Sequence, residues 1–249
     1  MAITIKTERE IALMRQAGKI VARVLGQLVE AVRPGLKTEE LDLIAEREIR
    51  LLGGTPSFKG YHGYPSSLCV SINDEIVHGI PGERVIQAGD IVSLDLGAIY
   101  QGYQGDAART VGVGSVSLKA EALMQAAQGA LKAGILLGRQ GNRLGDISAA
   151  VQQYAESKGF AVVREYTGHG LGREMHEEPL IPNFGSPGAG PILKKGMTLA
   201  IEPMLNAGDW RTRVGSNKWT VSTVDGSLSA HFEDTVLITD GDPEVLTVV

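Results

Sequence analysis

The chain has 249 residues, a formal net charge of −5 and a single cysteine, Cys69. This length can form one large domain or two small ones with a substantial buried core. The negative charge argues against nucleic acid as the main ligand, and the lone cysteine excludes an internal disulfide. Charged residues such as Lys6 and Arg15 interrupt any N-terminal signal core, and no later run is long enough to span a membrane. We therefore expect a soluble cytoplasmic protein.

Two helices are predicted near the start of the chain. Thr7 and Glu10 form a capping box, and apolar residues at helical spacing follow as far as Leu28. Thr38 is expected to cap a second helix, which ends before Gly53.

Strands are expected at residues 68–72 and 75–78, followed by a hairpin over residues 91–110. If its turn centres on residues 101–102, Asp95 pairs with Ala108, and Asp106 is the diagonal neighbour of Asp95 on the same face. Diagonal side chains lie about 7 Å apart, so the two carboxylates can share a site that requires a proton or a cation. Taken alone, this fragment is explained equally well by two solvated aspartates on an exposed face.

The second half of the chain repeats this order of elements. A helix is predicted after Ser117 and another over about 145–158, with Gly159 at its end. Strands are then expected at residues 161–166, 198–205, 219–224 and 229–238. No Pro- or Ser-rich linker interrupts the chain, which predicts a single domain over residues 1–249.

The two halves also resemble each other in sequence. Residues 89–95 align without a gap with residues 196–202, so that Asp95 falls opposite Glu202. This predicts an internal repeat, roughly residues 7–111 and 117–238. Chance similarity among common residues is the alternative, and it would make the coincidence of the two acids accidental.

Further candidate ligands lie in the second half. His169 is surrounded by glycines, where backbone can approach a ligand closely, and His176 follows it. Each histidine alone is more simply explained as a structural residue. Glu202 is held extended by Pro203, and Glu233 has apolar neighbours, where a glutamate is costly to bury unless it is paired or binds metal.

In this order and with these neighbours, five residues resemble the metal-ligand set of the methionine aminopeptidases: Asp95, Asp106, His169, Glu202 and Glu233. The specific motifs are Asp-Leu-Gly, Gly-His-Gly-Leu-Gly, His-Glu-Glu-Pro, Ile-Glu-Pro and Phe-Glu-Asp-Thr. The resemblance covers nearly the whole chain. It implies an α+β fold of the pita-bread type, in which a pseudo-two-fold repeat forms a curved antiparallel sheet covered by helices. The short spacing of the last two acids and the absence of an N-terminal extension point to the bacterial-like type I form.

The resemblance also implies a centre with two divalent metal ions. Four carboxylates and one imidazole suit manganese, iron, cobalt or zinc, and two such ions balance four negative charges. Asp106 and Glu233 would bridge both ions, Asp95 would hold one, and His169 and Glu202 the other. A bridging hydroxide would then attack the carbonyl group of an N-terminal methionine.

The remaining catalytic roles are carried over in the same way. Glu202 is expected to accept and shuttle the proton, His176 to stabilise the oxyanion, and His78 to contact the scissile amide or leaving nitrogen. The resemblance assigns the walls of an apolar methionine pocket, with His78 and His176 at its edge, to Tyr61, Tyr64, Cys69, Met175 and Trp219. Ordinary core packing is the simpler explanation of each wall residue taken singly.

Nascent peptide N-termini with a small second residue are the implied substrates, and the chain's own Met1-Ala2 start is of this kind. The ribosome is an implied transient partner of a monomer that binds neither nucleic acid nor membrane. Three residues depart from the family pattern: Met175, His231 and Asp234, where phenylalanine, glutamine and histidine are usual. His231 could hydrogen-bond a ligand carboxylate or face solvent.

Two alternatives use the same fold. A proline-directed peptidase, such as prolidase or aminopeptidase P, would share the metal ligands but usually carries a preceding domain. A non-catalytic peptide-binding relative would typically have lost ligands, whereas all five are present here. The sequence contains no Gly-x-Ser-x-Gly, His-Glu-x-x-His or P-loop motif, so serine, zincin and nucleotide chemistry find no support.

Overall fold

The structure is a computed structural model that describes residues 2–249. Within this range the helices are α1 (Glu8–Ala31), α2 (Thr38–Leu51), α3 (Leu118–Leu137), α4 (Leu144–Ser157) and the 3-10 turn η1 (Tyr61–Gly63). The strands of the first half are β1 (Thr55–Pro56), β2 (Leu68–Ile72), β3 (Glu75–Val77), β4 (Ile91–Tyr100) and β5 (Tyr103–Gly112). Those of the second half are β6 (Ala161–Val162), β7 (Thr167–Gly170), β8 (Glu177–Pro182), β9 (Thr198–Ile201), β10 (Met204–Asn206), β11 (Thr212–Val214), β12 (Val221–Thr223), β13 (Ser229–His231), β14 (Glu233–Leu237) and β15 (Glu244–Val245).

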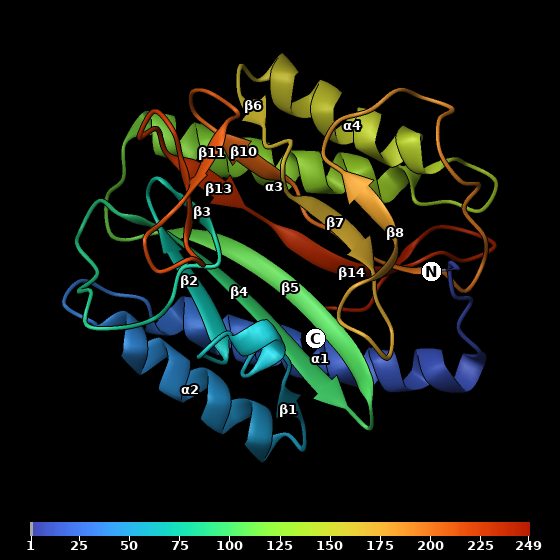
Figure 1. The fold of residues 1–249 in the computed structure, drawn as a ribbon, viewed down its shortest axis with the longest axis horizontal. Coiled ribbons are helices and arrows are strands. Elements are labelled where there is room, and N and C mark those ends of the chain that lie inside the picture. Colours follow the sequence, from blue (N-terminus) through green and yellow to red (C-terminus); the bar gives the residue numbers. More distant parts are fainter. Residues whose placement is uncertain (1) are drawn as a thin grey trace.

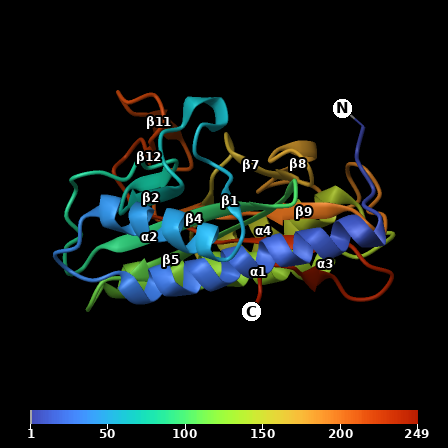
Figure 2. The same cartoon turned by 90° about the horizontal axis from the view of Figure 1, so that it is seen from below.

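Among the described residues, a nine-stranded antiparallel sheet forms the centre of the molecule (Figure 1). Its order is β1-β4-β5-β14-β9-β7-β8, with β2 also paired to β4 and β15 to β14. Figure 2 shows α1 and α3 on one side of this sheet and η1, β11 and β12 on the other. The predicted α+β class, with a curved antiparallel sheet covered by helices, is confirmed.

The sheet has a symmetric strand order. β2, β4 and β5 of the first half follow one another up to the centre, and β14, β9 and β7 of the second half follow from there outward. Each half also contributes one helix pair, α1 with α2 and α3 with α4. The central contact between the halves is therefore the pairing of β5 with β14.

The β4–β5 hairpin has the predicted register. Asp95 pairs with Ala108, and Gln101 and Gly102 form the turn with φ angles of 47° and 82°. Two consecutive residues with positive φ match the right-handed twist of paired strands, as in a type I′ turn. Both aspartates therefore reach the same face of the sheet, opposite the helices.

Helix α1 begins where its capping box predicts. The Thr7 amide donates to Glu10 Oε2 over 2.8 Å, and the Thr7 hydroxyl accepts from the Glu10 amide. Its inner face buries residues such as Val21 and Leu28 in a cluster with strands β4 and β5. Each such side chain contributes about 1.5–3 kcal/mol of burial free energy. Gly105 lies so close to α1 that a Cβ atom there would be 2.7 Å from the Gly18 nitrogen.

Two details of the predicted elements were wrong. Thr38 is the first helical residue rather than the cap, because Lys37 precedes the helix and its amide donates to Glu40 Oε1. The predicted strand over 198–205 is interrupted at Glu202 and Pro203, so β9 and β10 belong to different sheets. Proline has no N–H to donate, which ends the ladder at that point.

One further predicted strand is shorter in the structure, and several observed strands were not predicted. The strand expected over 161–166 comprises only β6, and β1, β7, β8, β11 and β15 were not predicted. Within residues 2–249, no helix has the length and apolar character needed to cross a membrane.

Candidate metal centre

Two neighbouring rows of the central sheet bring the predicted ligands together. In the first row Asp95 pairs with Ala108, which in turn pairs with Glu233. The small Ala108 side chain separates the two acids, so their carboxylates extend over the same space. Glu202 directly follows Ile201, the partner of Asp234 on β14, and thus arrives beside Glu233.

The second row supplies the other two ligands. Asp106 pairs with Gly97 on β4. The Thr235 hydroxyl accepts from the Asp106 amide over 3.0 Å and donates to the Asp106 carbonyl over 2.8 Å. Thr235 pairs with Ala200, which pairs with His169. The row thus places small side chains between the aspartate and the histidine.

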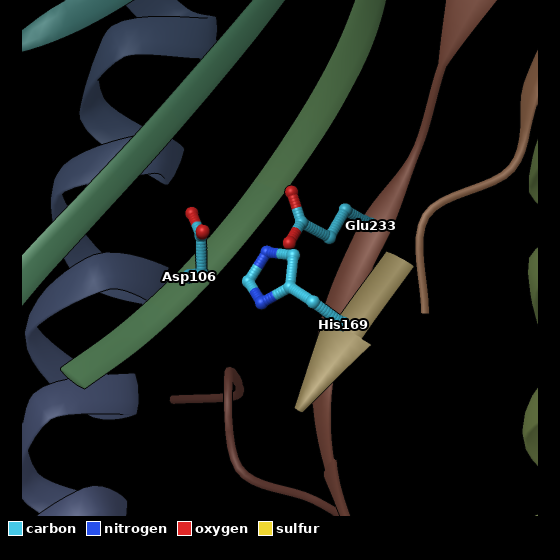
Figure 3. A group of neighbouring side chains, drawn as sticks. All are labelled: Asp106, His169 and Glu233. Carbon is cyan, nitrogen blue, oxygen red and sulfur yellow. The ribbon is translucent and has the colours of Figure 1, made fainter. Parts of the chain in front are cut away.

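Figure 3 shows Asp106, His169 and Glu233 pointing toward one another from three strands. Their possible ligand atoms all lie within 4.8 Å of one another. His169 Nε2 lies 3.5 Å from Glu202 Oε1. All five predicted ligands, including Asp95, line one cavity of about 250 Å³.

The carboxylates of this cluster are far from their ordinary electrostatic environment. Burial raises the pKa of Asp95 to about 7. Burial, with the charge of Asp95, raises the pKa of both Asp106 and Glu202, and burial with the charge of Asp106 raises that of Glu233. Four such groups cannot all be ionised together unless positive charge compensates them.

The buried oxygens also lack hydrogen-bond donors. Asp95 Oδ1, Asp106 Oδ1 and Glu233 Oε1 are buried and have no partner among the described residues. An unpaired buried carboxylate oxygen is costly, so the oxygens and their pKa shifts together fit a site for divalent cations.

His169 is prepared to be a ligand through Nε2. Its Nδ1 lies 2.9 Å from the Gly170 carbonyl oxygen, to which it donates a hydrogen bond. That contact places the proton on Nδ1 and leaves the Nε2 lone pair free, the arrangement found in metal-bound histidines. Burial, with the neighbouring His176, lowers the pKa of His169 to about 3, which keeps the imidazole neutral.

The two further histidines predicted to be catalytic lie at the same cavity. The ring of His176 is 4.2 Å from that of His169 between centroids, and the Tyr61 hydroxyl lies 2.8 Å from His176 Nδ1. His78 follows β3 with a φ of 60°, in the left-handed region. Burial and the nearby His176 lower the pKa of His78 to about 4, so it is neutral at physiological pH.

The predicted pocket walls surround the same space. Cys69 pairs with Asp95 across β2 and β4, and Tyr64 packs edge-on against Trp219 with 5.1 Å between ring centroids. Met175 lies over Gly97, where an added Cβ atom would be 2.9 Å from its methyl carbon. Tyr61, Tyr64, Cys69, His78, Met175, His176 and Trp219 all line the cavity.

The sequence analysis did not identify six other lining residues: Phe58, His62, Val77, Tyr166, Thr167 and Met204. Met204 follows the Ile-Glu-Pro motif, so its proximity to Glu202 could have been inferred. Phe58 lies on a loop without periodicity, and no local signal in the sequence places it at the site.

The two unusual residues near Glu233 are both buried but have different partners. His231 is 1% exposed, and its Nε2 lies 3.9 Å from both Glu202 Oε2 and Glu233 Oε2, so the solvent-facing alternative is wrong. Asp234 pairs with Arg109 over 2.7 Å and accepts from the Thr247 hydroxyl over 2.7 Å.

The model of metallopeptidase family M24 matches residues 12–240 of the chain. Methionine aminopeptidase of Clostridium acetobutylicum is 52% identical over 99% of both chains. Methionine aminopeptidase 1 of Bacillus subtilis is 50% identical over 99% of this chain and 100% of its own. The chain belongs to the methionine aminopeptidases of family M24.

Solved structures agree with this family. Methionine aminopeptidase from Thermotoga maritima matches with a TM-score of 0.98 and 47% identity over 100% of both chains. Prolidase from Pyrococcus furiosus matches with a TM-score of 0.79 and 25% identity, covering 98% of this chain but 65% of that protein. These matches confirm the predicted pita-bread fold of a metal-dependent hydrolase. The full-length similarity favours a methionine aminopeptidase over the proline-directed alternative.

Proposed function

We propose that this enzyme removes the N-terminal methionine from newly made proteins whose second residue is small. The observation that carries the proposal is one cavity that combines five ligand groups, three of them buried, with an apolar pocket. A thioether side chain suits a pocket of tyrosine, thiol and indole groups, because all of these are polarisable and largely apolar.

Two divalent ions are the proposed cofactors. Asp95, Asp106, His169, Glu202 and Glu233 would hold these ions. The orphaned oxygens and the raised carboxylate pKa values support this assignment, since two such ions balance four ionised acids. When bound, the ions supply a water molecule acidic enough to act as a nucleophile near neutral pH.

The surrounding side chains would then handle protons and position the peptide. Glu202 would accept the proton of the attacking water and pass it to the leaving amine. The neutral His176 would donate to the developing oxyanion, with its Nδ1 held by the Tyr61 hydroxyl. His78, which lines the same cavity, would contact the scissile amide.

The wider context follows from the same assignment. We propose a cytoplasmic, monomeric enzyme that meets its substrates transiently at the ribosome. Residues 1–249 would form a single catalytic domain, in which the repeat over 7–111 and 117–238 delivers equivalent acids from each half. The symmetric strand order on either side of the β5–β14 pair supports this organisation.

The test is release of free methionine from Met-Ala-Ser and Met-Lys-Ser peptides. Metal-free protein is assayed before and after addition of manganese, iron, cobalt or zinc. We expect turnover of the first peptide only, and only with added metal. Cleavage of X-Pro peptides instead would favour the proline-directed reaction, and ion binding without cleavage of either peptide would favour a peptide-binding module.

A further inference from the structure

His231 is the most deeply buried titratable group that the proposed reaction leaves without a role. We propose that His231 is a positioning residue that donates its Nε2–H to the carboxylates of Glu202 and Glu233 and so fixes the two side chains for metal binding. This inference rests on the proposed function, because it takes both glutamates as metal ligands. His231 is not among the residues that line the cavity, so it acts through the glutamates and not on the substrate.

The backbone of His231 is held firmly at the edge of the centre. Thr110 Oγ1 accepts from the His231 amide over 2.9 Å and donates to the His231 carbonyl over 2.7 Å. The Ser93 hydroxyl lies 2.8 Å from the same Thr110 oxygen, which saturates it. Since His231 and Glu233 are two residues apart in an extended segment, their side chains emerge on the same face.

The position of the imidazole proton follows from the acceptors around the ring. Neither His231 Nδ1 nor Nε2 has a hydrogen-bond partner among the described residues. The acid oxygens nearest to Nε2 are Glu202 Oε2 and Glu233 Oε2, each at 3.9 Å. Nε2 thus faces acid oxygens close enough for a small side-chain shift to complete a hydrogen bond, and a buried donor left unpaired costs about 1–3 kcal/mol. The proton therefore belongs on Nε2, facing the carboxylates.

A comparison with His169 separates this role from that of a sixth ligand. A metal-bound histidine donates its other ring N–H to a fixed acceptor, as His169 does to the Gly170 carbonyl. His231 has no such acceptor at Nδ1. Its ring is consequently arranged to donate through Nε2 and not to offer that lone pair to a cation.

The two carboxylates that face His231 Nε2 come from different strands. Glu202 follows β9 and Glu233 begins β14, and both flexible side chains present one oxygen to the same nitrogen. A shift of about 1 Å would bring either glutamate oxygen into hydrogen-bond range of His231 Nε2. The bond fixes the rotamer of a glutamate that must point its other oxygen into the cavity.

The main test compares the His231→Leu and His231→Gln variants. Leucine removes the donor, whereas the glutamine amide can donate from a similar place. Binding of Mn²⁺ to metal-free protein is measured by calorimetry, together with thermal unfolding in the absence of metal. We expect His231→Leu to weaken Mn²⁺ binding by about 10–100-fold. We expect His231→Gln to restore most of the affinity.

A Ser229→Ala variant is the matched control. Ser229 lies on the same strand, and its hydroxyl donates to the Leu205 carbonyl over 3.2 Å, away from the ligands. It should bind Mn²⁺ with unchanged affinity. Wild-type Mn²⁺ affinity in His231→Leu would overturn the inference. So would equal losses in the Leu and Gln variants with unchanged metal-free unfolding, which would indicate direct ligation.

A second measurement needs no variant. In Zn²⁺-loaded protein with ¹⁵N-labelled histidine, NMR should find the His231 proton on Nε2 and the His169 proton on Nδ1. A deprotonated Nε2 in His231 would overturn the inference. If wild-type protein binds neither Mn²⁺ nor Zn²⁺, the proposed function itself fails, which is distinct from a normal wild-type affinity that does not depend on His231.

Discussion

At the residue scale, small side chains determine the space available at the centre. Ala108 separates two acids in one sheet row, and Gly97 provides the floor on which Phe58 and Met175 rest. A ligand set alone would not specify a site, since larger neighbours would fill the same cavity. The positions between the ligands therefore matter as much as the ligands.

The first prediction concerns Gly97→Ala. The new Cβ atom would be 2.7 Å from Phe58 Cε1 and 2.9 Å from both Met175 Cε and Ser57 Cβ. Ser57 Cβ is attached to the backbone, so the segment of Ser57 and Phe58 must shift together with the pocket wall. We expect kcat/KM for Met-Ala-Ser to fall roughly tenfold, about 1.4 kcal/mol, mostly through KM. Unchanged kinetics would contradict the assignment of this wall to methionine binding.

A second prediction separates binding of metal from stabilisation of the oxyanion. His176→Ala removes a proposed oxyanion donor that is not itself a proposed metal ligand, although its ring packs against that of His169. Its kcat should fall by about 10²–10³-fold, while the bound metal measured by elemental analysis stays at the wild-type level. In Glu233→Gln, by contrast, the bound metal should also fall. Loss of metal in His176→Ala would assign it to the ligand set instead.

The positions of site residues could be predicted from the sequence where those residues lie within a recognisable motif. Asp95 and Asp106 could be placed on one face because strand alternation and a glycine turn fix their register. For His231 the sequence left two environments open, because one of the two acid oxygens near its ring belongs to Glu202, which only chain packing brings close. Phe58 and Tyr166 reach the cavity through loops whose paths depend on the whole fold.

At the scale of elements, the helices follow from local signals and the short strands do not. The Thr7 and Ser117 caps fix the starts of α1 and α3, since each side chain accepts an otherwise unpaired amide. Strands of two or three residues, such as β1 and β15, are too short for any periodicity. They form because a neighbouring strand presents an edge to them.

The cap of α1 gives a pH-dependent prediction. Hydrogen bonds from Tyr103 and Thr7 lower the pKa of Glu10 from 4.5 to about 2. A lowered native pKa stabilises the fold above the unfolded value of about 4.5, and this contribution is lost as the pH falls toward 2. Glu10→Gln should thus reduce the free energy of unfolding near pH 7 by ~1 kcal/mol, after allowance for solvent screening.

Urea unfolding of both proteins at several pH values between 3 and 7 checks this. The difference between wild type and Glu10→Gln should shrink as the pH decreases. A difference that is constant over this range would mean that the carboxylate charge contributes nothing, and that only the shape of the side chain matters.

A buried ion pair braces the loop that carries Met175 and His176. Lys6 Nζ lies 2.7 Å from Glu177 Oε2, and Glu177 Oε1 accepts from the Arg173 amide over 3.0 Å. Burial raises the pKa of Glu177, but the bonds from Lys6 and Thr4 outweigh it and leave the pKa below its usual value. The N-terminal segment thereby supports one wall of the cavity.

Lys6→Met should therefore affect both stability and substrate binding. Removing Lys6 leaves the partly buried Glu177 charge without its partner, at a cost below the about 3–5 kcal/mol of a fully buried pair. We expect a lower melting temperature and a higher KM for Met-Ala-Ser. Lys19→Met, on the outer face of α1, is the matched control and should change neither. An unaltered KM in Lys6→Met would show that the loop keeps its shape without the brace.

At the scale of the whole molecule, the metal centre joins the two halves. Asp95 and Asp106 come from one half, and His169, Glu202 and Glu233 from the other. Removal of metal with a chelator should lower the melting temperature, because the four acids then repel one another across the central strand pair. Ion binding at 100 times the dissociation constant contributes about 2.7 kcal/mol, equivalent to roughly 5–10 °C for a domain of this size.

Differential scanning calorimetry with and without Mn²⁺ measures this shift. Adding Mn²⁺ back after chelation should restore the original melting temperature, whereas Mg²⁺, which keeps its water ligands more strongly, should restore less. Identical melting curves in all conditions would show that the centre contributes nothing to the association of the halves.

The strand β14 carries acids at two successive positions, Glu233 toward the cavity and Asp234 toward Arg109. A slip of this strand by one residue would exchange them and still leave an acid over the centre, one methylene shorter. The presence of an acid at this position therefore does not by itself disfavour the shifted register. Hydrogen bonds from two hydroxyl groups do: Thr235 bonds to the backbone of Asp106, and Thr247 donates to Asp234. The hydrogen bonds of two threonines, and not the acids themselves, thus distinguish the correct strand register from the shifted one.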